Sequence, residues 1–164
     1  LVNNAGLAAG LSSIEEGSLD DWERMIDTNV KGLLYISRKI LPLLKQQRSG
    51  HVFNISSTAG KIVYKNGNVY CATKHAVDAL SQAMRIDLLP YGIKVTCISP
   101  GMAETEFSLV RFNGNEEKAN ELKAIAEKMD LDIMILLNKD QKAKYKLLTE
   151  DNKKQQEAYS RMNR

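Results

Sequence analysis

Apolar residues recur at spacings of three and four along two long stretches of the chain, and this periodicity predicts two amphipathic helices. The first stretch follows Ser18, a good N-cap residue, and continues as one long helix or as two helices in tandem until Ser49 and Gly50 end it. The second stretch covers residues 69–89, and Pro90 ends it.

Short runs of β-branched and apolar residues alternate with these helices. Residues 51–56 and 93–98 each predict a strand, and Leu1 and Val2 predict the end of another strand. The resulting order of strand, helix, strand, helix, strand favours right-handed crossovers onto a parallel sheet. The predicted fold class is therefore α/β, with a doubly wound parallel sheet.

The character of the chain changes after Gly114. All 10 glycines and all 3 prolines lie at or before this residue, whereas the residues after it are dense in charge and nearly neutral overall. We therefore predict a folded first part followed by a charged helical tail. Within this tail, Asn138 and Gln141 have the spacing of a helix-capping box.

Charge and cysteine content argue against several classes of partner. The 164 residues carry a formal net charge of only +3, which is too small to indicate a nucleic-acid or anionic-membrane surface. The longest apolar stretches contain basic residues and fall short of a membrane span, and the N-terminal residues do not resemble a signal peptide. The 2 cysteines have no zinc-ligand spacing. We therefore expect a cytoplasmic protein that binds no metal, nucleic acid or membrane.

Tyr70 and Lys74 lie four residues apart at the start of the second predicted helix, so their side chains share one helical face. That spacing alone is common in helices. The ends of the three predicted strands add a second signal, because each is followed by small or polar residues. In a doubly wound sheet the carboxyl ends of the strands border the ligand crevice, and small residues let a ligand approach the backbone. The sequence therefore predicts a site where these strand ends meet the Tyr70–Lys74 face.

Five short segments carry a more specific signal. They are NNAG at 3–6, the asparagine of DTNVKG at 29, NISSTAG at 54–60, YCATK at 70–74 and SPGMAETEF at 99–107. Tyr70 also lies 13 positions after Ser57. In this order and spacing the chain resembles the short-chain dehydrogenase/reductase family. TEFSLVRFNGN at 105–115 is similar to its branch of NADP-dependent 3-hydroxy acid, serine and allo-threonine dehydrogenases.

The resemblance covers about residues 1–118 and implies a Rossmann fold of which only a part is present. Residues 119–164 are left as a charged helical tail of unknown role. The Gly-rich phosphate loop that precedes NNAG in the family has no counterpart here, so we expect an N-terminally truncated member whose sheet lacks its first strands. Two alternative functions follow. One is hydride transfer between NAD(P) and a secondary alcohol, such as a small 3-hydroxy acid or hydroxy amino acid. The other is an inactive fragment that retains only the helices used for self-association.

The resemblance also implies a role for each matching residue. Tyr70 exchanges a proton with the substrate oxygen, and Ser57 hydrogen-bonds the same oxygen. Lys74 binds the nicotinamide ribose and lowers the tyrosine pKa, and Asn29 holds a water that links Lys74 to solvent. The residues implied to bind the cofactor, NADP or NAD, are Asn4, Ala5, Gly6, Tyr70, Lys74, Pro100, Gly101 and Thr105. Because the family's subunits pack through the equivalents of the long helices, a homodimer or homotetramer is expected.

Elementary electrostatics agrees with the pairing of Tyr70 and Lys74. A free phenol has a pKa of about 10, so a role near neutrality needs a decrease of about 3 units, or about 4 kcal/mol. One ammonium about 4 Å away supplies that much at an effective dielectric of about 20. Lysine is therefore needed for its charge, and tyrosine for a pKa that can be brought into range.

Other polar residues have plainer interpretations. Ser56 is one position short of the serine-to-tyrosine spacing and is expected to be structural at the strand end. His51 lies far from the ligand end of its strand, and His75 lies on a different helical face from Lys74, so neither is expected to act in catalysis. Without the other motifs, Asn29 would be interpreted as a buried turn-forming residue inside a helix.

Overall fold

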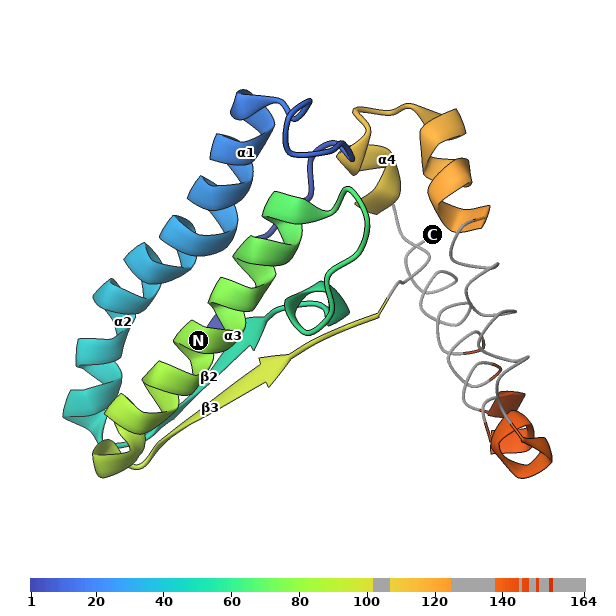
Figure 1. The fold of residues 1–164 in the computed structure, drawn as a ribbon. Helices are drawn as coiled ribbons and strands as arrows, with labels where there is room; N and C mark the ends of the chain where they lie inside the picture. Colours follow the sequence, from blue (N-terminus) through green and yellow to red (C-terminus); the bar gives the residue numbers. More distant parts are fainter. Residues whose placement is uncertain (102–106, 125–137, 145, 148–149, 151–153, 155–164) are drawn as a thin grey trace. The chain divides into compact units, whose positions relative to one another are not determined.

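The computed structural model describes residues 1–101, 107–124, 138–144, 146–147, 150 and 154 (Figure 1). The chain divides into two compact units, Leu1–Met102 and Ala103–Arg164, and each is described by itself. The predicted division at residue 118 stays a prediction. Within the described ranges, no helix combines the length and the apolar character that crossing a membrane requires.

The first unit contains a three-stranded parallel sheet in the order β1-β2-β3. The strands are β1 (Val2–Asn3), β2 (Gly50–Ile55) and β3 (Ile93–Ile98). Val52 pairs with Val95 and Asn3 pairs with Asn54 in the strand register. The predicted α/β class and parallel pairing are therefore confirmed, and the bounds of β2 and β3 agree with the predicted strands to within one residue.

The first predicted helix has three parts, which are α1 (Leu19–Ile26), a π-helical segment η1 (Asp27–Gly32) and α2 (Leu33–Gln47). Ser18 caps α1 as predicted, because its Oγ accepts a hydrogen bond from the amide of Asp21 at 3.4 Å. The expected stop at Ser49-Gly50 is confirmed, because α2 ends at Gln47 with Arg48 as its C-cap. Arg48 ends α2 in the left-handed conformation at φ 50°, and Gly50 already belongs to β2.

The π-helical segment agrees with a regularity among the buried residues of this helix. Met25, Asn29, Leu33 and Ser37 are all buried and follow one another at intervals of four. In an α-helix of 3.6 residues per turn, side chains at intervals of four shift by about 40° around the helix axis at each step. The wider π-helical turn between α1 and α2 offsets this rotation, so all four side chains stay on the inner face.

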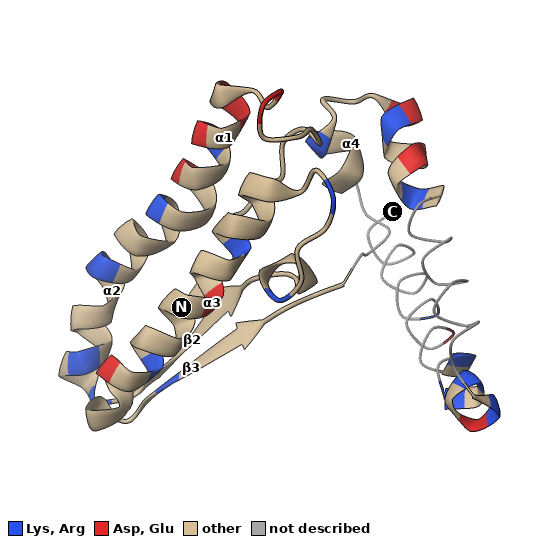
Figure 2. Ribbon diagram, viewed as in Figure 1, with Lys and Arg blue, Asp and Glu red and all other residues tan. Residues whose placement is uncertain are grey.

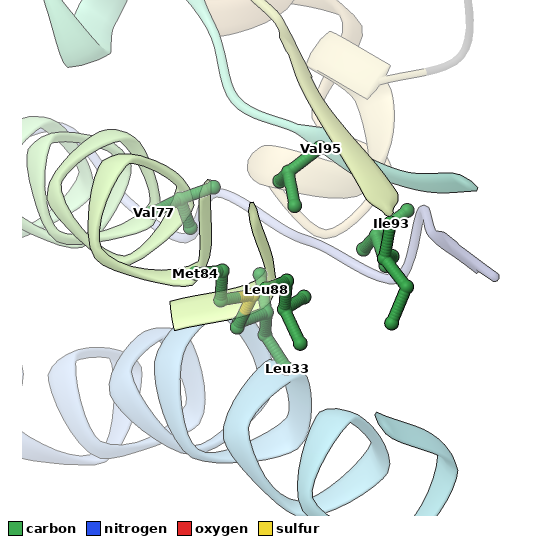
Figure 3. Packing of buried hydrophobic residues seen from close by; sticks show 7 residues of the cluster. Leu33, Val77, Met84, Leu88, Ile93 and Val95 are labelled. Carbon is green, nitrogen blue, oxygen red and sulfur yellow. The ribbon is translucent and has the colours of Figure 1, made fainter. Parts of the chain in front are cut away.

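The second predicted helix is α3 (Asn68–Leu88), followed by a short 3-10 turn, η3 (Leu89–Tyr91), and by Gly92 at φ 69°. Helices α2 and α3 pack against the same face of the sheet (Figure 1). Figure 3 shows the apolar core between them. This core consists of Leu33, Val52, Val77, Met84, Leu88, Ile93 and Val95. Burial of each such side chain contributes about 1.5–3 kcal/mol.

A polar layer crosses the same interior. Asn3 Nδ2 donates to Asn54 Oδ1 at 2.8 Å and to Ser37 Oγ at 3.2 Å. Asn54 Nδ2 in turn donates to Ser81 Oγ at 2.9 Å. These bonds join β1, β2, α2 and α3, so they favour one strand register over its neighbours. In the described part of the chain, every fully buried side-chain nitrogen and oxygen has a hydrogen-bond partner.

Charged residues of both signs lie along the first two helices of the first unit. Figure 2 shows acidic residues at the start of α1 and basic residues along α2. Asp20 and Asp21 lie in the first turn of α1, and Lys45 lies in the last turn of α2. Both placements are favourable for the helix dipole.

The second unit is helical where it is described. It contains α4 (Phe107–Arg111) and helical residues at 116–124 and 139–144. The capping box predicted at Asn138 is confirmed. The Asn138 amide donates to Gln141 Oε1, and the Gln141 amide donates to Asn138 Oδ1, both at 3.0 Å.

Candidate active site

Tyr70 and Lys74 lie on the inward face of the first turns of α3, as their spacing predicts. Both are buried, with 7% and 6% of their surfaces exposed. Lys74 Nζ is 5.8 Å from the centroid of the Tyr70 ring, so the ammonium lies beside the aromatic ring. The structure therefore brings together the two residues on which the predicted chemistry depends.

Lys74 joins α3 to the end of β2. Its Nζ donates to the carbonyl oxygen of Ile55, the last residue of β2, at 3.2 Å. Burial lowers the pKa of the Lys74 ammonium, because the protein interior solvates a charge less well than water does. A side chain at Gly6 would place its Cβ 3.2 Å from Lys74 Nζ, so glycine keeps this space open.

Asn29 lies in the π-helical segment, and its side-chain amide makes three hydrogen bonds. Oδ1 accepts from the Leu7 amide, and Nδ2 donates to the Leu7 carbonyl, both at 2.8 Å. Nδ2 also donates to Thr73 Oγ1 at 3.0 Å. The Thr73 hydroxyl donates to the Tyr70 carbonyl oxygen at 2.8 Å. Asn29 therefore ties the loop after β1 to the helical turn that carries Tyr70.

Ser57 follows the end of β2 and caps the short 3-10 turn η2 (Thr58–Gly60). Its Oγ accepts from the Ala59 amide at 3.2 Å, and this leaves the hydroxyl hydrogen to donate elsewhere. The preceding Ser56 is buried, and its hydroxyl donates to the Lys74 carbonyl oxygen at 3.0 Å. Ser56 is thus a structural residue, as expected, and Ser57 is the serine with a hydrogen to give.

The residues after β1 and β3 lie open to solvent. Asn4, Ala5 and Gly6 are exposed after β1, and Pro100 and Gly101 are exposed after β3. A Cβ at Gly101 would have no neighbour within 4 Å. The ends of β2 and β3 are joined directly, because the Thr58 amide donates to the Pro100 carbonyl at 2.9 Å. Thr105 lies outside the described residues.

The two histidines lie away from this group. His51 Nε2 is 2.8 Å from Thr96 Oγ1, and its ring stacks on that of Phe53 with centroids 3.9 Å apart. His75 is exposed, and its Nδ1 is 2.9 Å from the Cys71 carbonyl. Among the described residues, no cluster of three or more His, Cys, Asp or Glu side chains could hold a metal ion.

Two groups that hydrogen-bond Asn29 at the site were not identified from the sequence. Thr73 carries the bond from Asn29 to the Tyr70 turn, and the main chain of Leu7 holds both ends of the Asn29 amide. A signal for Thr73 was present, because a threonine three residues after Tyr70 can return a hydrogen bond to the helix backbone. Leu7 offers no such signal, since it contributes only main-chain atoms.

Comparison with known proteins defines the class of protein that this fold and site represent. The family model described as short chain dehydrogenase matches residues 1–116. The chain belongs to the short-chain dehydrogenase family.

Several members of this family are more specifically similar. An NADP-dependent 3-hydroxy acid dehydrogenase, YdfG, of Salmonella typhi is 52% identical over 120 residues, which are 73% of this chain and 48% of that protein. A serine 3-dehydrogenase of Agrobacterium fabrum is 48% identical over 122 residues, 74% of this chain and 49% of that protein. The chain spans about half the length of these curated relatives.

A solved structure supports the fold assignment. The closed form of a serine dehydrogenase complexed with NADP⁺ superposes with a TM-score of 0.72 and is 50% identical in sequence. The superposition covers 74% of this chain and 49% of that one. The α/β arrangement of the first unit is therefore that of part of a Rossmann-type dehydrogenase fold.

Proposed function

We propose that this protein transfers hydride between NADP and a small 3-hydroxy acid or hydroxy amino acid, with Tyr70 as the group that exchanges the substrate's proton. The observation that carries the proposal is the buried pair of Tyr70 and Lys74, held on one face of α3 next to the end of β2. The names of the two similar dehydrogenases support the choice of cofactor and substrate class.

Tyr70 and Ser57 divide the work at the substrate oxygen. In the oxidation, the Tyr70 phenolate takes the hydroxyl proton while Ser57 donates a hydrogen bond to the same oxygen. Ser57 is suited to this because its Oγ accepts from the Ala59 amide, which leaves the hydroxyl hydrogen free to donate to the substrate oxygen. A bound nicotinamide would supply the hydride acceptor, and the protein supplies orientation and the path for the proton.

Lys74 and Asn29 connect Tyr70 to solvent. Protonated Lys74 stabilises the phenolate, and its own lowered pKa lets it release a proton more readily than an exposed lysine. Both Asn29 Nδ2 hydrogens are used by Leu7 and Thr73, so a water between Asn29 and Lys74 would donate to an Asn29 oxygen, either the main-chain carbonyl or the remaining lone pair of Oδ1. The π-helical segment favours this role, because π-helical turns leave main-chain groups outside the α-helical hydrogen-bond pattern.

The residues present fit a nicotinamide cofactor. Asn4, Ala5, Gly6, Pro100 and Gly101 leave the backbone open to a flat ligand, since all five are exposed and Gly101 has free space where a Cβ would be. Lys74 and Tyr70 border this region from α3, where Lys74 would bind the nicotinamide ribose. We propose that Thr105 also binds the cofactor, on its nicotinamide side.

Self-association through the long helices belongs to the same proposal. Tyr35, Ile36 and Leu43 on α2 are 65%, 51% and 54% exposed, and Ile86 near the end of α3 is 74% exposed. Large apolar side chains on neighbouring helices are typical of a contact surface. A homodimer or homotetramer would bury them.

The test uses the 164-residue chain with NADP and serine, allo-threonine or 3-hydroxypropionate, and follows the formation of NADPH by its absorbance. Tyr70→Phe removes only the phenol oxygen and should lower kcat by about 10²- to 10⁴-fold, the usual contribution of a positioned proton-transfer group. Tyr91→Phe is the matched control, because Tyr91 lies in the η3 turn after the far end of α3 and should leave kcat unchanged.

Binding of NADP, measured by calorimetry, separates the two functions considered for this chain. The enzymatic proposal expects binding by both the wild type and Tyr70→Phe. A chain that neither binds NADP nor forms NADPH, yet still sediments as an oligomer, would support a fragment that retains only the self-association helices.

A further inference from the structure

The segment that carries Ser57 is fixed to α3 at points on both sides of this serine. On the N-terminal side, Ser56 donates its hydroxyl hydrogen to the Lys74 carbonyl oxygen at 3.0 Å. On the C-terminal side, Lys61 Nζ bonds Asp78 Oδ1 at 2.5 Å, and Asp78 lies one helical turn after Lys74. These contacts join residues that are 17 and 18 positions apart in the sequence.

Gly60 lets the segment approach the helix closely. A Cβ at this position would lie 2.7 Å from the Lys74 carbonyl oxygen and 2.5 Å from Ser56 Oγ. The first of these atoms belongs to the helix backbone, which cannot move aside. Gly60 is buried, and its closeness to α3 places residues 56–61 against the main chain of Lys74 itself.

Asp78 is held firmly as the acceptor of the Lys61 bond. Gln82, one turn further along α3, donates from Nε2 to Asp78 Oδ2 at 2.9 Å, so both carboxylate oxygens are bonded. The side chain of Asp78 is only 16% exposed, whereas that of Lys61 is 52% exposed. The Lys61 ammonium keeps the pKa of the Asp78 carboxyl below its ordinary value, as an ion pair with hydrogen-bond geometry does.

We propose that Lys61 and Asp78 are positioning residues that, together with Ser56 and Gly60, hold Ser57 at a fixed place relative to Tyr70. We call these four residues the α3 clamp. The clamp lies close to the site, because it contacts α3 at Lys74 and Asp78 and Tyr70 lies one turn before Lys74. The catalytic part of this inference rests on the proposed function, and the mechanical part does not.

The physical reason for such a clamp is the short 3-10 turn after β2. Its internal main-chain bonds are all short in range, with the Gly60 amide donating to the Ser57 carbonyl at 2.9 Å and the Lys61 and Ile62 amides to the Thr58 carbonyl at 2.9 and 3.0 Å. A turn of this length does not hold its own orientation well. Because a small displacement of a catalytic group lowers the rate steeply, an anchor outside the turn is useful.

The experiment compares Lys61→Met and Asp78→Asn with the charge-exchanged double variant Lys61→Asp/Asp78→Lys in the full 164-residue chain. Lys65→Met is the matched control, because Lys65 is an exposed lysine of the same loop. The first measurement is hydrogen exchange of the amides of residues 59–62. In both single variants these amides should exchange about three- to fivefold faster, the range expected for one partly exposed ion pair. The double variant should restore most of the protection.

The second measurement is steady-state kinetics with NADP. Loss of the clamp should lower kcat about fivefold to tenfold and leave the KM for NADP unchanged, because Ser57 moves while the cofactor contacts stay. Unchanged exchange in Lys61→Met relative to Lys65→Met, or a double variant no better than the singles, would overturn the clamp. If the wild type shows no hydride transfer, the proposed function fails, and the exchange data alone decide the clamp.

Discussion

The two halves of α3 bury different kinds of side chain on one continuous face. The first half buries Tyr70, Thr73 and Lys74, whose polar atoms contact Asn29, Ile55 and the helix backbone. The second part, from Val77 to Leu88, buries the apolar side chains of Val77, Met84 and Leu88 against the sheet and α2 (Figure 3), and with them Ser81, whose hydroxyl accepts from Asn54. One half therefore carries the chemistry and the other the packing.

The difference shows how one helix can hold a site whose buried polar groups lower the stability of the fold. Buried polar groups contribute little net stability even when they are hydrogen-bonded, and a buried ammonium lowers it. Buried apolar side chains contribute most of the favourable free energy of folding. Because both halves belong to one helix, the apolar half fixes the position of the helix and the polar half follows it.

The largest effect on stability should therefore come from the apolar half. Leu88→Ala should lower the free energy of unfolding by about 2–5 kcal/mol, since Leu88 is 1% exposed and its loss leaves a cavity. Ile86→Ala, two residues earlier on the exposed side, should change it by about 0.5 kcal/mol at most. Urea unfolding followed by circular dichroism measures both, and equal losses would contradict the assignment of the core.

A smaller loss should follow from removing a hydroxyl in the polar half. Thr73→Val keeps the shape of the side chain but leaves one Asn29 amide hydrogen without its acceptor, which costs about 1–3 kcal/mol. Thr73→Ser retains the hydroxyl and should restore most of the loss. If valine and serine are equally destabilising in urea unfolding, the hydrogen bond is not the reason for the burial of Thr73.

The smallest effect should appear in the pH dependence of Lys74→Met. Burial lowers the pKa of Lys74 in the folded state, so between this lowered value and the unfolded value of 10.5 the unfolded chain binds more protons. The stability of the wild type should therefore rise with pH in that window. Lys74→Met should lack this rise, so its stability relative to the wild type should decrease between pH 7 and about pH 10. A difference that is constant with pH would show that Lys74 titrates normally.

Much of the fold was predictable, because its signals are local. Residues 93–98 were predicted as a strand from a β-branched run between Gly92 and Ser99, and β3 has these bounds. The start of α1 followed from Ser18, whose capping bond depends only on residues within one turn. The face shared by Tyr70 and Lys74 followed from helical spacing alone.

The parts that escaped prediction depend on contacts between distant segments. The bonds from Asn29 to Leu7 span 22 residues, and no periodicity in the sequence points from one to the other. Lys61 and Asp78 lie 17 positions apart, and no pattern in the sequence indicates that they meet. The left-handed conformation of Arg48 at the end of α2 was not predicted, because glycine more usually adopts it.

The π-helical segment at Asp27–Gly32 sets the rotation between two buried helix faces, that of α1 and that of α2. Upstream of it, Met25 packs beside Ala8 and Tyr70, and downstream of it, Leu33 packs with Val52 and Leu88. The extra residue in this wide turn keeps both side chains in phase with one interior. Deletion of one residue between 27 and 32 would rotate α2 by about 100° relative to α1. Its apolar face would then turn away from the sheet. The packing on either side therefore fixes the number of residues in this helix, apart from any constraint on their types.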